Sequence, residues 1–372
     1  LAQAAAAGGM TPLVINDHPL VDGGAEPGRI HSVAGIDYIL VGTGEGGGAL
    51  RRLLLRITRP VRVGRVIARY RAPDVPPCAT LPSGLCSLSM LTWLQNRHGV
   101  RVTADVVERH DPEQFERGRM APYFVRHRWT TIVAARFADQ MIVISSHLAN
   151  RYHRISPEPL VVPPLVDLDE YPEHVSGLGE VIELLYVGNP QGKDQLGVVM
   201  DAIRSMPPEK RERLRFTIAG ADEDALKRNP DVGPERVRAM GPGLIALGYV
   251  DRQRVLHLLS TSDFSIVIRP DAGYANAGFP SKVSESLAAG CPLICNVTSD
   301  LGEYLSDGRN ALLCSSTDGS SAASQESIAD VLSRALGLSP LARHQMSREA
   351  RVSAESFSTA TWGRVLNAWL RG

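Results

Sequence analysis

Lysine is scarce in this sequence of 372 residues, and long apolar runs are missing. Only four positions carry lysine: Lys193, Lys210, Lys227 and Lys282. Since no apolar run reaches about 18 residues, no segment predicts a membrane-spanning helix. Aromatic residues make up only 5% of the chain, which leaves most of the packing to leucine, valine, isoleucine and alanine. A nucleic-acid partner is not expected.

The cysteines give no sign of a disulfide framework or of a metal site. There are five of them, an odd number without tight pairing. Cys291 and Cys295 have the spacing of a metal pair, but they lie in an apolar, strand-like run where buried thiols are expected. The sequence therefore predicts no metal, no bound cofactor and a reduced, cytoplasmic compartment. Because the sequence begins at Leu1 rather than Met, further residues are expected upstream.

Charge is unevenly distributed although the net charge is zero. Residues 1–168 carry 19 arginines, no lysine and 14 acidic residues, a net charge of +5. The stretch 51–71 holds no acid and interleaves leucine and isoleucine with eight arginines: Arg51, Arg52, Arg56, Arg59, Arg62, Arg65, Arg69 and Arg71. One interpretation is peripheral contact with the inner face of a membrane or with an acceptor phosphate. The other is a solvated helix beside a strand.

Short apolar runs alternate with helix-length segments along the whole chain. In the first half we expect strands at 12–16, 36–41, 65–70, 100–108, 140–144 and 160–162, and helices at 85–96, 129–138 and 146–152. In the second half we expect strands at 183–187, 215–219, 246–250, 264–268 and 293–296, and helices at 196–205, 252–260, 280–289, 327–336 and 359–371. This alternation predicts an α/β fold with parallel sheets covered on both faces.

The proline-rich, acidic segment 163–182 interrupts the alternation and marks a linker. It predicts two Rossmann-like, doubly wound domains, residues 1–168 and 169–358, with a cleft between them. The last helix, within residues 359–372, is expected to pack back on the first domain. Ligands of such sheets bind outside the carboxyl ends of the strands.

The most informative motif starts at Arg269, directly after an expected strand. A loop follows, and a helix is expected to begin near Pro280, a residue that suits the first helical turn. The unpaired N–H groups and the dipole at such a helix start favour an anion such as a diphosphate. Ser281 and Glu285 are four residues apart and share a face, which can present a hydroxyl to phosphate and a carboxylate to sugar hydroxyls.

The run Glu-Ser-Leu-Ala-Ala-Gly-Cys-Pro that begins at Glu285 resembles the retaining family-4 glycosyltransferases of GT-B fold. These enzymes have two glutamates separated by seven positions, and the first would fall at position 277, where this chain has Ala277. The resemblance implies that Glu285 contacts the donor ribose, while the usual carboxylate for the donor sugar is absent. In the variant Phe-Pro-Ser-Lys, Ser281 and Lys282 would bind the donor phosphates.

Residues 184–194, Leu-Leu-Tyr-Val-Gly-Asn-Pro-Gln-Gly-Lys-Asp, resemble the first turn of the donor domain in the same family. Here Gly188 would lie against the donor. Lys193 would be the main cation on the leaving diphosphate, with Arg269 as a second. In the first half, Glu108 ends an expected strand and His110 lies in the loop after it, and the resemblance implies contact with the sugar or acceptor. The alternative for His110 is a loop histidine with local bonds only.

The resemblance implies a retaining transferase that moves a sugar from a nucleoside diphosphate sugar to an acceptor hydroxyl. Residues 1–168 would bind the acceptor, which is a small molecule, a glycan or a lipid-linked molecule, and residues 169–358 would bind the donor. His110, Lys193 and Arg269 are the candidate catalytic residues. The expected setting is a bacterial polysaccharide, glycolipid or natural-product pathway, and the donor phosphate itself would take the acceptor proton.

Three alternatives stay open. A nucleotide-sugar epimerase of GT-B fold would convert the donor without an acceptor. A non-catalytic homologue, suggested by Ala277, would bind nucleotide and turn nothing over. An NAD enzyme is suggested by the G-x-G-x-x-G pattern at residues 42–47, but no acid stands about 20 residues further on as a ribose partner.

Overall fold

The computed structural model describes residues 1–16, 29–40, 58, 61–70, 78–85, 88–156, 158–175, 179–190, 193–315 and 322–371. The chain forms two compact units. Unit 1 comprises Leu1–Pro163 and Thr359–Gly372, and unit 2 comprises Pro164–Ser358. The division thus falls at the Pro163–Pro164 pair, near the beginning of the segment expected to be a linker.

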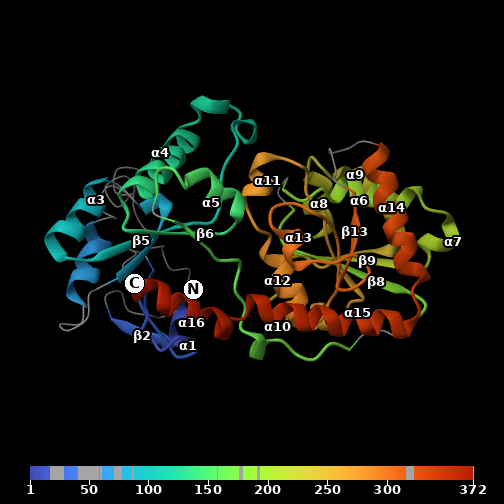
Figure 1. Ribbon diagram of the computed structural model, residues 1–372. Helices are drawn as coiled ribbons and strands as arrows, with labels where there is room; N and C mark the ends of the chain where they lie inside the picture. Colours follow the sequence, from blue (N-terminus) through green and yellow to red (C-terminus); the bar gives the residue numbers. More distant parts are fainter. Residues whose placement is uncertain are drawn as a thin grey trace. The chain divides into compact units, whose positions relative to one another are not determined.

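Unit 1 contains two sheets (Figure 1). The larger is parallel, with the order β4-β5-β6-β7, and its strands are Cys78–Pro82, Arg101–Val106, Gln140–Val143 and Leu160–Val161. In the smaller, β1 (Leu13–Asn16) pairs parallel with β3 (Ile36–Leu40). β2 (Ile30–Val33) pairs antiparallel with β3 through a two-residue turn, Ala34 and Gly35, in which both φ angles are positive.

Five helices of unit 1 have defined bounds: α1 Ala2–Ala7, α3 Leu88–Thr92, α4 Pro122–Phe137, α5 Ser146–Tyr152 and α16 Thr359–Arg371. Shorter turns lie at Ser83–Leu85, Trp93–Arg97, Pro112–Gln114 and Gly118–Met120. α16 packs directly on α1, because a Cβ on Gly363 would lie only 2.6 Å from the Ala4 carbonyl oxygen. The end of α16 is also bonded to the larger sheet, since Gln140 Nε2 donates to the Trp369 carbonyl at 2.9 Å.

Two expected elements of unit 1 need correction. The strand expected at 65–70 is wrong, because residues 61–69 are helical. Val63 and Ile67 pack against the core one helical turn apart, and the exposed Arg65 lies between them in the sequence. The helix expected at 129–138 begins earlier, at Pro122. The bounds of α5 are those expected, and Ser145 caps this helix, since its Oγ accepts from the Leu148 N–H.

Unit 2 contains a six-stranded parallel sheet with the order β10-β9-β8-β11-β12-β13. The strands are β8 Ile182–Val187, β9 Leu214–Ala219, β10 Leu244–Ala246, β11 Phe264–Val267, β12 Leu293–Asn296 and β13 Ala311–Cys314. Numbered within the unit, this order is 3-2-1-4-5-6, that of the doubly wound Rossmann fold.

Helices cover both faces of this sheet (Figure 1). They are α6 Leu196–Ser205, α7 Pro208–Arg211, α8 Glu223–Arg228, α9 Gly233–Met240, α10 Arg252–Thr261, α11 Gly273–Ala277, α12 Ser281–Ala288, α13 Leu301–Tyr304, α14 Ala322–Gly337 and α15 Pro340–Ser353. On one face α6 packs against α9 and α14, and on the other α12 packs against α15. β11 and β12 are buried at every position, as expected of central parallel strands.

The thiols of unit 2 are structural. Cys291 and Cys295 are fully buried, and burial raises the pKa of each thiol well above its usual value. The cysteines described by the structure, Cys78, Cys291, Cys295 and Cys314, are all free. Within the described ranges, no group of residues has the arrangement of a metal site, and no helix is long and apolar enough to cross a membrane.

The half-buried His174 makes unit 2 sensitive to acid. A Cβ on Gly290, which follows α12, would lie 2.9 Å from His174 Cβ, so His174 packs directly against the end of this helix. Burial lowers the pKa of His174 from 6.5 to about 4. The unfolded chain therefore binds an extra proton between these values, and the free energy of unfolding falls as the pH drops through this window, by at most about 3 kcal/mol.

We expect His174→Gln to weaken this pH dependence, measured by urea unfolding between pH 7 and pH 4.5. His257→Gln, at an exposed position of α10, should retain the slope of the unmodified protein. Equal slopes for all three proteins would show that His174 is not the responsible group.

Candidate functional site

The strand order of unit 2 changes direction between β8 and β11. The chain runs outward from β8 to β9 and β10, and then returns to the other side of β8 with β11. Loops that leave these two neighbouring strands diverge and open a crevice outside their carboxyl ends. Gly188 follows β8 and Arg269 follows β11 closely, so two of the expected site residues lie at this switch point.

Glycines bring the strand ends close together at the switch point. Gly188 and Gly220, which follow β8 and β9, have φ angles of +130° and +126°. A Cβ on Gly220 would lie 2.4 Å from the Gly188 carbonyl oxygen, closer than atoms can approach. A Cβ on Gly188 would in turn lie 2.8 Å from Lys282 Cε. Glycine is therefore needed at both positions, and Gly188 leaves the space that the Lys282 side chain occupies.

A buried carboxylate joins the cations of the site. Asp194 lies between β8 and α6 and its side chain is only 7% exposed. It forms an ion pair with Lys282 Nζ and another with Arg269 Nε at 3.3 Å, and accepts a hydrogen bond from Tyr186 Oη at 2.8 Å. Burial raises the pKa of Asp194, but Lys282, Arg269 and Tyr186 outweigh it, so the pKa lies below its usual value. The carboxylate is thus held ionised.

Lys282 is the central cation of this cluster. Its Nζ donates to Tyr186 Oη at 2.8 Å and lies 4.0 Å from the centroid of the same ring. Burial lowers the pKa of Lys282, and Asp194 opposes this effect. With Arg269, it gives the cluster two cations against one carboxylate, a net positive charge at the edge of the sheet.

The backbone of Arg269 is fixed by Asn296, the last residue of β12. Asn296 Oδ1 accepts from the Arg269 N–H at 2.9 Å, and its Nδ2 donates to the Arg269 carbonyl at 2.7 Å. The carbonyl of the preceding Ile268 accepts from the Gln195 N–H at 2.9 Å. The loops after β8 and β11 and the end of β12 are therefore bonded to one another at the switch point.

Lys193 occupies a different environment from Lys282. It is exposed on the loop between β8 and α6, one residue before Asp194. The structure therefore brings Gly188, Arg269 and Lys282 together, with Lys282 rather than Lys193 at the centre of the buried cluster. The role expected of Lys193 stays a prediction.

α12 carries Ser281 and Glu285 one helical turn apart. Pro280 is the N-cap residue, and no side chain caps the helix start. Ser281 is exposed there, beside the backbone N–H groups that an anion would use. Glu285 Oε1 accepts from Arg252 Nη1 at 2.6 Å, and Arg252 Nη2 donates to Tyr171 Oη at 2.8 Å. Arg252 and Tyr171, which the sequence analysis did not identify, therefore hold the Glu285 carboxylate in place.

Position 277 offers no carboxylate to a ligand. Ala277 is the last residue of α11 and is completely buried. A glutamate there would have to displace packed core atoms, since interiors are close-packed. Any sugar contact must therefore come from other residues.

Glu108 and His110 belong to unit 1, in the loop after β5. His110 Nε2 lies 3.6 Å from Glu108 Oε1. Rings of Phe115, Tyr123 and His127 surround the imidazole, with centroid distances of 5.7, 5.2 and 4.7 Å. The His110 side chain is 12% exposed. This packing agrees with both interpretations of His110: a loop histidine with local contacts only, and a histidine held in position to contact a ligand.

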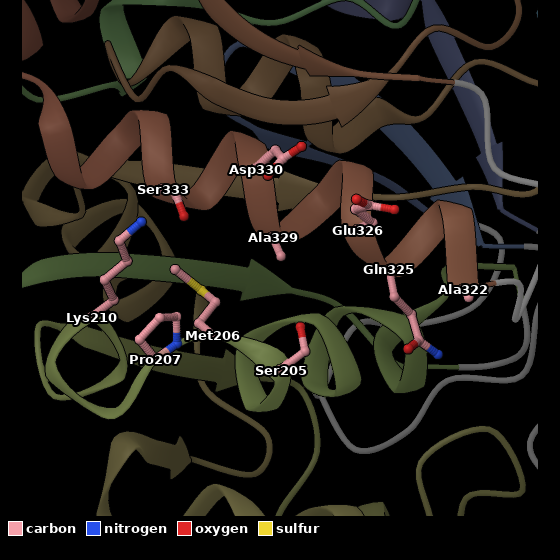
Figure 2. A pocket seen from close by; sticks show the side chains of 10 residues that line it. All are labelled: Ser205, Met206, Pro207, Lys210, Ala322, Gln325, Glu326, Ala329, Asp330 and Ser333. Carbon is pink, nitrogen blue, oxygen red and sulfur yellow. The ribbon is translucent and has the colours of Figure 1, made fainter.

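Unit 2 also has a pocket of about 400 Å³, whose lining residues are shown in Figure 2. Its lining residues come from the end of α6, from α7 and the residues before it, and from α14: Ser205, Met206, Pro207, Lys210, Ala322, Gln325, Glu326, Ala329, Asp330 and Ser333. Since α6 begins at the carboxyl edge of β8, its last residues reach the opposite edge of the sheet. This pocket is therefore separate from the crevice described above.

Residues 182–334, from β8 into α14, match the family of glycosyl transferases group 1. The match lies within unit 2, so unit 2 carries a domain similar to the group 1 glycosyltransferases. The match covers the whole six-stranded sheet and every site residue of unit 2 named above except Tyr171. No curated protein matches the sequence.

Solved structures show that the likeness in fold extends over the whole chain. A sucrose-phosphate synthase from Thermosynechococcus elongatus is 15% identical with a TM-score of 0.72, covering 100% of this chain and 90% of that one. WaaG, a glycosyltransferase involved in lipopolysaccharide biosynthesis, is 15% identical with a TM-score of 0.66, covering 100% and 94%. Anabaena HepE in complex with UDP-glucose is 13% identical with a TM-score of 0.63, covering 96% and 98%. The GT-B fold expected from the sequence is confirmed.

Two expectations concern residues that the structure does not describe. The glycine-rich pattern at 42–47 lies outside the described residues. Of the arginines in the stretch 51–71, only Arg62, Arg65 and Arg69 lie within them, on the helical residues 61–69.

Proposed function

We propose that this protein is a glycosyltransferase that moves a sugar from a nucleoside diphosphate sugar to an acceptor hydroxyl with retention of the anomeric configuration. The observation that supports it most is the pair of cations, Lys282 and Arg269, at the Rossmann switch point of a group 1 domain. The uncapped start of α12 lies one residue before Lys282. Fixed positive charge and free backbone N–H groups are what a diphosphate requires.

Each cluster residue has a place in the reaction. As the bond between the anomeric carbon and the phosphate oxygen breaks, negative charge grows on the leaving diphosphate. Lys282, Arg269 and the first N–H groups of α12 would stabilise that charge, and Lys193 would add a flexible cation from its loop. The acceptor oxygen bonds to the anomeric carbon on the face that the phosphate leaves. Because attack and departure take place on the same face, no protein nucleophile is needed. The proton of the acceptor hydroxyl passes to an oxygen of the leaving phosphate.

Glu285 would accept hydrogen bonds from the donor ribose. Its carboxylate is 28% exposed and is oriented by Arg252, so ribose binding would require no large movement of the side chain. Proteins of similar fold include HepE in complex with UDP-glucose and an E. coli trehalose-6-phosphate protein bound with UDP-2-fluoro glucose. UDP-sugars are therefore the first donors to test.

The acceptor is assigned to unit 1, with Glu108 and His110 as its candidate contacts. It is a small molecule, a glycan or a lipid-linked molecule, and the reaction is placed in the cytoplasm. Peripheral membrane contact through residues 51–71 is retained as part of this proposal. No metal and no cofactor beyond the donor is invoked.

The reaction is tested by following donor consumption with and without an acceptor library and by NMR of the product. We expect acceptor-dependent release of nucleoside diphosphate, with the donor anomer kept in the product. Sugar conversion without an acceptor would favour the epimerase instead. Nucleotide binding without turnover, across all donors and acceptors, would favour a non-catalytic homologue.

A further inference from the structure

The α4 helix of unit 1 exposes apolar side chains on the face turned away from the core. Its inner face is anchored by buried residues such as Val133 and Ala134. On its outer face Trp129 is 67% exposed and Val125 is 52% exposed, and they lie one turn apart. Tyr123 is 46% exposed, and Met120, just before the helix, is 83% exposed. Large apolar side chains gathered in this way mark an interaction surface.

The charged side chains of α4 and of the residues just before it are all positive. Residues 117–138 contain no acid and five exposed arginines: Arg117, Arg119, Arg126, Arg128 and Arg136. Arg126 lies over the Tyr123 ring at 5.6 Å. Within the described part of the chain, none of the five takes part in an ion pair. Their charge is therefore available to an anionic partner.

A small pocket of about 230 Å³ combines the two properties. It is lined by Arg119, Phe124, Val125, Arg128, Trp129 and Ile132. The apolar side chains form most of this lining, and the two guanidinium groups supply its charge. Such a site suits an anionic head group attached to an acyl chain better than a wholly polar ion.

We propose that α4 with residues 117–121, here called the α4 surface, docks on an anionic lipid bilayer. Met120, Val125 and Trp129 would enter the boundary between head groups and acyl chains, where tryptophan and tyrosine are favoured. The arginines would meet lipid phosphates. A second copy of the chain is a poor occupant, because a twofold contact would place these arginines opposite their own copies. The inference does not depend on the transfer reaction.

The test is flotation of the full chain with vesicles of phosphatidylcholine alone, or with about one third phosphatidylglycerol. We expect binding only to the anionic vesicles, and loss of that binding at high salt. Arg119→Gln with Arg128→Gln should lower the partition coefficient about 30-fold, at about fivefold for each arginine. Trp129→Ser should lower it about tenfold or more.

Matched controls are Leu341→Ser and Arg348→Gln on α15 of unit 2, both at exposed positions. They should bind like the unmodified protein, and all variants should keep its melting temperature. Equal binding by the α4 variants, or equal binding to neutral vesicles, would overturn the proposal.

Light scattering and phosphate competition distinguish other occupants. If Trp129→Ser dissociates an oligomer, the surface is a contact between copies. If inorganic phosphate releases the protein far better than chloride at the same ionic strength, a free-phosphate site replaces the bilayer. The proposal predicts neither result. Failure of sugar transfer with intact vesicle binding would reject the proposed function and leave this inference standing.

Discussion

Lys282→Met is expected to lower kcat/KM for sugar transfer by about 10²–10³-fold, the usual effect of removing one charged group from a developing anion. Methionine keeps much of the length and apolar volume of the lysine stem beside Tyr186. The loss would therefore report the missing charge rather than a cavity. Initial rates at several donor concentrations provide the measurement, and Lys227→Met, at an exposed pair of α8, is the matched control.

The Lys282→Met variant also leaves the buried Asp194 carboxylate without its lysine partner, and replacement of Asp194 provides the control for this effect. Removal of Lys282 leaves the carboxylate with Arg269 and Tyr186 alone, and breaking a buried pair can cost about 3–5 kcal/mol. The double variant Lys282→Met, Asp194→Asn removes both charges and should recover much of the stability, measured by urea unfolding. Turnover should stay low. Recovery of turnover in the double variant would mean that Lys282 only neutralises Asp194.

Gly220→Ala is expected to damage both folding and nucleotide binding. Its φ of +126° is rare for residues with a side chain, and the added Cβ would meet the Gly188 carbonyl oxygen at 2.4 Å. Strain and overpacking together suggest a loss of about 2–4 kcal/mol in the free energy of unfolding. Relief of the clash would move Gly188, and with it the space that Lys282 occupies.

Gly243→Ala is the matched control, because the nearest atom to its added Cβ is the Leu214 carbonyl oxygen at an ordinary 3.5 Å. Urea unfolding and calorimetric titration with nucleoside diphosphate should show normal values for this control. Gly220→Ala proteins with unchanged stability and affinity would refute the close approach of the two strand ends.

Local signals explain which elements could be predicted from the sequence. The bounds of α6, β12 and α16 match those expected, because apolar periodicity and flanking glycine or proline act within each segment. α15 was missed because its sequence is rich in polar residues and its burial depends on α12. β2 was missed because a short, exposed hairpin strand has little apolar pattern.

In the site, too, residues marked by a local sequence signal could be predicted, and residues that depend on tertiary contacts could not. Gly188, Arg269 and Lys282 were identified because each stands at a strand-to-loop or loop-to-helix junction. Asp194 was missed, since its contact with Lys282 joins residues 88 positions apart. One signal was available in the sequence. Asp194 lies in a loop that is expected to bind an anion, and a carboxylate in such a place requires a neighbouring cation.

Other partners in the site depend wholly on tertiary packing. Asn296 is the last residue of a buried strand, and only the sheet order places it beside Arg269. Arg252 and Tyr171 reach Glu285 from segments far apart in the sequence. No local pattern distinguishes these three from ordinary polar residues.

The central claim is that the switch point of unit 2 binds the diphosphate and ribose of the donor. Calorimetric titration with UDP, GDP, dTDP, ADP and NAD tests it most directly, on the unmodified protein, Lys282→Met, Glu285→Gln and Lys227→Met. We predict that one nucleoside diphosphate binds, that the first two variants weaken it at least about tenfold, and that Lys227→Met does not. Binding of NAD alone, or equal affinities in all four proteins, would contradict the account.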